Sequence, residues 1–166
     1  MLSGLLLVAM LAATPQPASL ASVIIGPQPL TVTAGTVTVT PATISFTAPN
    51  PTANPTVAGS ASAVLHFTLA AGASTWNVKV SAPASFTNCS TVPVTAITAS
   101  ATCTTVTGTS SCTSGALSTG GTQIASGNKT GGAAAFTITI AFTLADSWAY
   151  IASSACSLAL TYSVTG

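Results

Sequence analysis

Few residues of this chain could carry acid–base chemistry, and they are Lys79, Lys129, Asp146 and His66. The 166 residues include no Arg and no Glu, and charged residues make up 2% of them, against about a quarter in ordinary soluble domains. Hydrolysis by paired carboxylates needs two acids, and Asp146 is the only internal one. A serine triad would have to use His66 and Asp146, but there is no G-x-S-x-G motif. We therefore expect no enzymatic activity, and we expect His66 on the polar face of a strand.

The sequence also lacks the patterns of metal, cofactor and nucleic-acid sites. Metal sites use clustered His, Cys or carboxylate ligands, and the chain has no C-x-x-C, no H-x-x-x-H and no acidic loop. No glycine-rich phosphate loop follows a predicted strand. Two lysines cannot neutralise a nucleic-acid backbone. We expect no metal, no cofactor and no nucleic-acid partner.

The N-terminal segment, residues 1–21, has the features of a secretory signal. An apolar run covers residues 5–13, prolines follow it, and Ser19-Leu20-Ala21 predicts cleavage after Ala21. No Lys or Arg precedes the run, so a retained apolar segment is the alternative. The run is too short to span a bilayer. We predict a secreted chain whose mature part has no membrane span.

The cysteines Cys89, Cys103, Cys112 and Cys156 predict two disulfides, since exported chains oxidise their thiols. Four cysteines allow about three connectivities, which sequence does not distinguish. We favour Cys89–Cys103, which would close a short excursion, with Cys112–Cys156, which would tie a loop to the last strand. Buried free thiols are the alternative.

Two N-glycosylation sequons are present, Asn88-Cys89-Ser90 and Asn128-Lys129-Thr130. Asn50 and Asn54 are each followed by proline and are excluded. Asn88 and Asn128 are therefore the candidate acceptors, and the dense Ser and Thr would also allow O-linked sugar. Attached glycan would supply the hydration that charged residues provide elsewhere.

Alternation with period two predicts strands throughout the chain. Inward faces are predicted for Phe136, Ile138, Ile140, Phe142 and Leu144, for Cys156, Leu158, Leu160, Tyr162 and Val164, for Leu65, Phe67 and Leu69, and for Trp76, Val78 and Val80. Lys79 falls on an outward face. Threonine fills many outward positions, where it keeps β-propensity without adding charge. Residues 104–132 are the least patterned and predict a long exposed connection with one short strand, Thr122-Gln123-Ile124.

These strands predict an all-β fold, an antiparallel immunoglobulin-like (Greek-key) β-sandwich with an extended N-terminal strand. The chain divides into the apolar segment 1–21, an extended strand region 22–40, and a sandwich domain 41–166. Within 22–40, Val and Thr alternate after the spacer Gly26-Pro27-Gln28-Pro29.

The C-terminal part of the chain resembles the closing strands of bacterial and archaeal surface β-sandwich proteins. It runs through an alternating strand from Phe136, the turn Asp146-Ser147-Trp148, and a last strand that ends in Thr-Tyr-Ser-Val-Thr. As a whole the chain is similar to subunits of extracellular filaments, such as chaperone-usher-type pilins and archaeal thread pilins. The resemblance implies that an N-terminal strand of one subunit completes the sandwich of the next. Its implied donor residues are Val32, Val37, Val39 and Ile44.

Two physical arguments also favour a homopolymeric, non-catalytic structural subunit of a surface filament. Its edge strands lack the lysines with which monomeric sheets prevent pairing, and near-zero net charge promotes association. For residues 31–40 we weigh two interpretations equally: a donor strand that pairs with the next subunit, and an ordinary first strand that pairs within its own subunit.

A second hypothesis is a secreted adhesin or carbohydrate-binding sandwich, which would use exposed aromatic side chains. The candidates are Trp76, Trp148, Tyr150 and Tyr162, of which Tyr162 is in phase with the core. Ice or mineral binding by the Thr-x-Thr run at residues 36–40 ranks last, because no regular repeat follows it.

Overall fold

The structure is a computed structural model, and it describes residues 24–27, 31–32, 38–41, 44–47, 51–72, 74–104, 108–150 and 156–166. The predicted signal segment 1–21 and the donor candidate Val37 lie outside the described residues.

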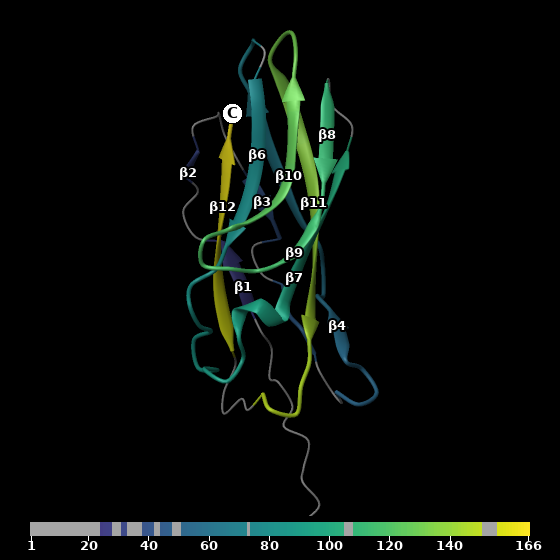
Figure 1. Cartoon of the computed structure of the whole chain (residues 1–166), viewed down its shortest axis with the longest axis vertical. Coiled ribbons are helices and arrows are strands. Elements are labelled where there is room, and N and C mark those ends of the chain that lie inside the picture. The colour runs from purple at the N-terminus through teal and green to yellow at the C-terminus, as the bar shows by residue number, and fades with distance from the viewer. Residues whose placement is uncertain are drawn as a thin grey trace, which may run out of the picture.

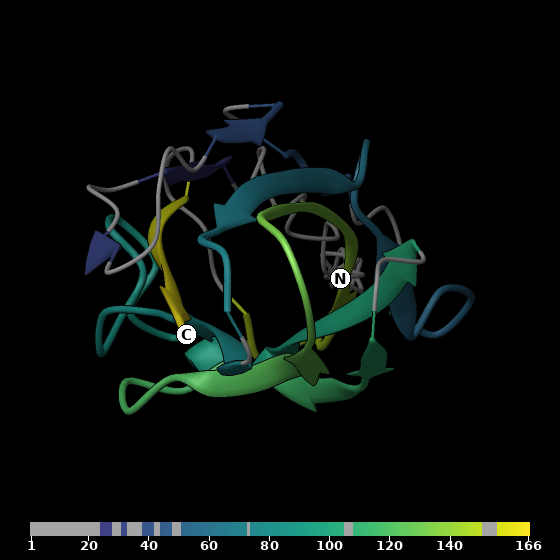
Figure 2. The same cartoon turned by 90° about the horizontal axis from the view of Figure 1, so that it is seen from above.

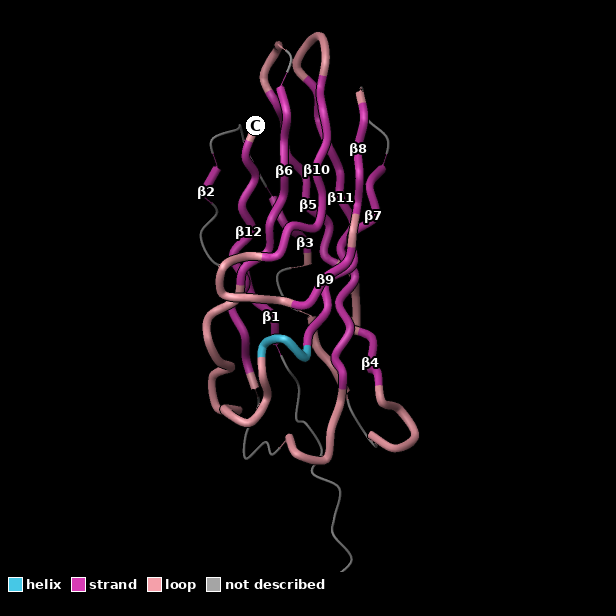
Figure 3. Tube along the Cα trace, in the orientation of Figure 1, coloured by secondary structure: helices cyan, strands magenta, loops and turns pink. Residues whose placement is uncertain are grey.

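The described strands form two sheets (Figures 1 and 3). The first has the order β1-β12-β6-β10-β8, with β2 also paired to β12, and the second has the order β3-β5-β11-β7-β9, with β4 also paired to β11. The first sheet comprises β1 (Ile24–Pro27), β2 (Thr31–Val32), β6 (Ser74–Ser81), β8 (Thr109–Cys112), β10 (Thr122–Lys129) and β12 (Ser157–Thr165). The second comprises β3 (Thr38–Thr40), β4 (Thr56–Ala58), β5 (Ala63–Leu69), β7 (Ile97–Thr104), β9 (Ser114–Ala116) and β11 (Ala134–Ala145), and a short 3-10 helix, Val94–Ala96, precedes β7.

One hydrophobic core lies between the sheets, and the predicted inward faces supply most of it. The inward residues of β5, β6, β11 and β12 named above are all buried, whereas Lys79 and His66 are exposed. Figure 2, which looks along the long axis, shows the strands surrounding this core. The period-two prediction is confirmed for these strands, because each pleated strand has one face against the opposite sheet.

The all-β sandwich with largely antiparallel sheets is confirmed, but an immunoglobulin-like strand order is not. In the immunoglobulin plan some consecutive strands pair as hairpins within one sheet. Here the long strands β5, β6, β7, β10, β11 and β12 lie alternately in the second and first sheets. Each connection between them therefore passes from one layer to the other.

The prediction of a long exposed connection over residues 104–132 is wrong. The described part of that stretch contains β8, β9 and the eight-residue strand β10, which pairs with both β6 and β8. A bulge between Gln123 and Ala125 shifts the register of β10 against β6. The extra residue breaks the strict alternation, which explains why the sequence showed only the first residues of this strand.

Candidate assembly site at the N-terminal seam

The two outer long strands on one side of the sandwich, β12 and β5, are covered by the N-terminal strands. We call this side the N-terminal seam, and it consists of β12 and β5 together with β1, β2 and β3. Strands β1 and β2 pair with β12 in parallel, and β3 pairs with β5 antiparallel. Figure 2 shows β1 and β2 beside β12 at this side. The pairings are short, with four, two and three register partners respectively.

The structure places three of the four donor candidates at this seam or in the core beside it. Val32 is the register partner of Val164 at the end of β12. Val39 lies opposite Leu65 and packs, half-buried, against the core. Ile44 is 2% exposed. In a single chain Val32 and Val39 therefore pair with strands of their own subunit.

Strand β12 offers an uncharged surface to whatever strand pairs with it. Its inward residues from Leu158 to Val164 are buried, and its outward residues Ser157, Ala159, Thr161 and Ser163 are half-buried. Burial also raises the pKa of the Tyr162 hydroxyl, because the ionised form would lose its hydration. The strand therefore carries no charge that would repel another edge.

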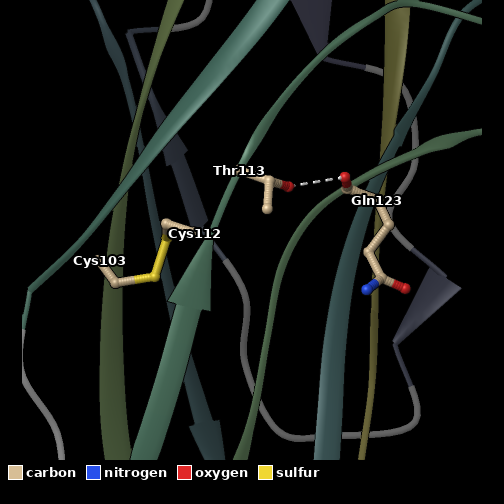
Figure 4. The surroundings of a disulfide bond; sticks show 4 residues. All are labelled: Cys103, Cys112, Thr113 and Gln123. Carbon is tan, nitrogen blue, oxygen red and sulfur yellow. Dashed lines mark hydrogen bonds between the residues drawn. A yellow bond between two sulfur atoms is a disulfide. The ribbon is translucent and has the colours of Figure 1, made fainter.

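The opposite side of the sandwich is closed by continuous chain. Strands β8 and β9 are separated only by Thr113, and they belong to different sheets. The backbone of Thr113 accepts a hydrogen bond from Ala101 N–H at 3.0 Å and donates one to the Ile124 carbonyl at 2.9 Å. Its hydroxyl also donates to the Gln123 carbonyl at 3.2 Å (Figure 4). One residue thus joins β7 of the second sheet to β10 of the first.

Both disulfides form, but with a different pairing from the one we favoured. The structure joins Cys89 to Cys156 and Cys103 to Cys112, and the predicted pairs Cys89–Cys103 and Cys112–Cys156 are wrong. Strand order explains the error, because β6 and β10 lie between β12 and β8 and so separate Cys156 from Cys112.

Each disulfide fixes one part of this arrangement. Cys103–Cys112 ties β7 to β8 on the closed side (Figure 4). Cys89–Cys156 anchors the start of β12, beside the bridge between Thr87 and Ser157. The chain has no cysteine before Cys89, so no disulfide can fix the N-terminal strands.

The candidate acid–base residues are not brought together. The His66 ring hydrogen-bonds the Thr137 hydroxyl at 2.9 Å, and one Asp146 oxygen accepts from the Ser147 N–H at 2.9 Å. Within the described part of the chain, no three His, Cys, Asp or Glu side chains gather where they could hold a metal ion. Lys129 is fully buried, which sequence reasoning missed because the bulge in β10 is not visible in the pattern.

The aromatic candidates divide between core and surface. Trp76 packs with Phe67 and Phe136, its ring centroid 5.7 and 5.1 Å from theirs. Trp148 is 55% exposed, and its Nε1–H donates to the Thr52 hydroxyl at 3.1 Å. Tyr150 is half-buried against the core. Only Trp148 therefore presents a large apolar surface to solvent among the residues that the structure describes.

Comparisons with protein-family models, with curated proteins and with solved structures find no match to this chain. No helix in the described residues has the length and apolar character needed to cross a membrane.

Proposed function

We propose that this protein is a non-catalytic structural subunit of an extracellular surface filament, which polymerises when the N-terminal strands of one copy pair at the seam of the next. The observation that carries the proposal is the difference between the two sides of the sandwich. One side is closed by Thr113, which bonds both sheets, and by Cys103–Cys112. Among the described residues, the strands that close the other side are the short β1, β2 and β3.

Exchange of these strands between copies would conserve the contacts that they make within one chain. Domain swapping of this kind has a low cost, because an identical element fills the same place in each subunit. The acceptor strand β12 stays anchored during the exchange through Cys89–Cys156. Main-chain hydrogen bonds along the added strand would supply the affinity.

The composition of the described strands favours association over repulsion. Natural edge strands are blunted by lysines and inward-pointing charges, but β3, β5 and β12 contain no Lys, Arg, Asp or Glu. Two disulfides are compatible with an extracellular location, where thiols oxidise. The resemblance to pilin-like subunits supports the same proposal.

A cross-linking experiment tests the exchange directly. Thr31 and Ser163 are register partners across the seam, and Thr31→Cys with Ser163→Cys places two free thiols there. We expect a short bis-maleimide to produce a ladder of covalent oligomers from filaments on a denaturing gel. A matched control is Thr98→Cys with Ala116→Cys, a register pair between β7 and β9 on the closed side. The control pair should link within one chain only.

Two outcomes would contradict the proposal at different points. Filaments in which the Thr31–Ser163 pair links only within single chains would exclude strand addition as the means of assembly. Native material that electron microscopy shows to be monomeric would exclude the structural role itself. Deleting residues 22–40 should abolish filaments.

A carbohydrate-binding or adhesin module is the second candidate, and the exposed Trp148 is the observation that favours it. The bond from its indole to Thr52 holds the ring in one orientation, and a rigid aromatic side chain loses little entropy on binding. Binding of the monomer on a glycan array, lost in Trp148→Ala, would support this function. An array without signal would discard it.

A further inference from the structure

Strand β10 turns one of the two sequons outward by means of its bulge. Ile124 and Ala125 are both buried, and beyond them the inward positions are Gly127 and Lys129, with Asn128 exposed. Without the bulge, strict alternation from Ile124 would turn Asn128 inward and Lys129 outward. The bulge therefore decides which residue of the sequon faces solvent.

Lys129, the middle residue of this sequon, anchors the strand from the inside. Its ammonium group donates to the Gly72 carbonyl at 2.6 Å and to the Gly131 carbonyl at 3.3 Å. The same two turns are joined by a bond from Gly72 N–H to the Gly131 carbonyl at 2.9 Å. Figure 1 shows these turns side by side at the end of the sandwich. With Lys129 fixed in this way, the outward orientation of Asn128 is fixed too.

The surroundings of Asn128 leave room for a large substituent. Its register partners are Thr75 on β6 and Thr109 on β8, and both are exposed residues with short side chains. Thr130, the hydroxyl residue of the sequon, is exposed just past the end of β10. An ideal Cβ at the neighbouring Gly131 would have no heavy atom within 4 Å. A glycan here could extend from the sheet without displacing a packed side chain of any residue that the structure describes.

The other sequon lies in a tight turn that a disulfide ties to the residue before β12. Asn88 is exposed, but it has a positive φ of 66° between Phe86 and Cys89, which bridge each other and are both buried. Cys89, its middle residue, forms the disulfide to Cys156. Glycan transfer to Asn88 would have to compete with formation of this disulfide, whereas Asn128-Lys129-Thr130 contains no cysteine.

We infer that Asn128 carries an N-linked glycan and that Asn88 does not. The donor would be an activated oligosaccharyl diphosphate. The Asn128 amide nitrogen would form a bond to the anomeric carbon, the bond from that carbon to the diphosphate would break, and the amide would give up one proton. The glycan would cover the outer face of the first sheet and leave the N-terminal seam open. The inference holds whether or not the chain forms filaments.

Peptide mass spectrometry of the reduced protein from its native host tests this inference. Chymotryptic cleavage after Phe86, Leu117 and Phe136 places the two sequons on separate peptides, 87–117 and 118–136. We expect a glycan mass on 118–136 and none on 87–117. An unmodified 118–136 peptide, or a glycan on 87–117, would overturn the inference.

Variants expressed in the same host separate sequon chemistry from folding. Asn128→Gln and Thr130→Ala should both lose the glycan. Thr130→Ser should keep it, because the sequon is preserved. Asn88→Gln should leave the glycan mass found on the intact protein unchanged. Loss of the glycan in Thr130→Ser together with its retention in Thr130→Ala would contradict N-linkage at Asn128.

Discussion

Removal of each disulfide separately should cost unequal amounts of stability. The pair Cys89–Cys156 spans 67 residues of sequence and Cys103–Cys112 spans 9. Loop-closure entropy then gives about 4.4 kcal/mol for the first and about 2.6 kcal/mol for the second at 25 °C. Burial widens the gap, because Cys89 and Cys156 are buried and their truncation leaves a cavity, whereas Cys103 and Cys112 are only half-buried.

The measurement compares Cys89→Ala/Cys156→Ala with Cys103→Ala/Cys112→Ala in guanidinium unfolding of the single chain without reductant. We expect the first variant to lose about 2 kcal/mol more than the second. An equal loss, or a larger one for Cys103→Ala/Cys112→Ala, would refute the reasoning.

A thiol titration of the unfolded variants checks the pairing itself. Either double variant above should show no free thiol. A crossed variant, Cys89→Ala/Cys103→Ala, should show two free thiols. Cys112 ends β8 and Cys156 directly precedes β12, and β6 and β10 lie between these two strands. Two free thiols in the first variants and none in the crossed one would restore the pairing that the sequence suggested.

Five further substitutions test the packing of the chain and the titration of Tyr162. Gly127→Ala should lower the free energy of unfolding by about 1–3 kcal/mol or more through overpacking, because its Cβ would lie 2.7 Å from Trp76 Cζ2. Gly120→Ala is the control: its Cβ would have nothing within 4 Å, and urea unfolding should show a change within about 0.5 kcal/mol. Burial raises the pKa of Tyr162 in the folded state. The contribution of this residue to the free energy of unfolding is therefore complete below the unfolded pKa of about 10, and it falls by about 1.4 kcal/mol for each pH unit above that value. Melting temperatures should change little between about pH 2 and 8, because the chain contains a single internal carboxylate and a single histidine, and a steep fall in acid would contradict this. Above about pH 10 the melting temperature should fall less steeply in Tyr162→Phe than in the unchanged chain. Trp76→Ala should lower the free energy of unfolding by about 3–5 kcal/mol, and Trp148→Ala should lower it by less than about 0.5 kcal/mol. Equal losses would contradict the placement of Trp76 in the core and of Trp148 on the surface.

The sequence predicts the long strands well because their alternation survives in three dimensions. In β11 and β12 each second residue is buried, as the pattern of Phe136 to Leu144 and Leu158 to Val164 indicates. Only the first three residues of strand β10 were predicted, because its bulge places two consecutive residues in the core. A period of two cannot represent that insertion.

The candidate site was predictable only in part. The segment 22–40 could be recognised from sequence as extended, uncharged strand. The sequence does not show that β1 and β2 pair with β12 whereas β3 pairs with β5, because this depends on which long strands lie at the edges of the sheets. Hydrogen bonds between residues far apart in sequence decide that order, and local pattern carries no information about them. The Thr113 bridge that closes the other side escaped for the same reason.

By itself the sequence determined the chemical character of this protein: three internal charges, four cysteines and threonine-faced strands that alternate. These properties depend only on residue type and on the two-residue repeat of a strand. The tertiary structure decided the disulfide partners, the outward Asn128 with the buried Lys129, and the two unlike sides of the sandwich. Each of these depends on strand order or register, which arises from contacts between distant segments.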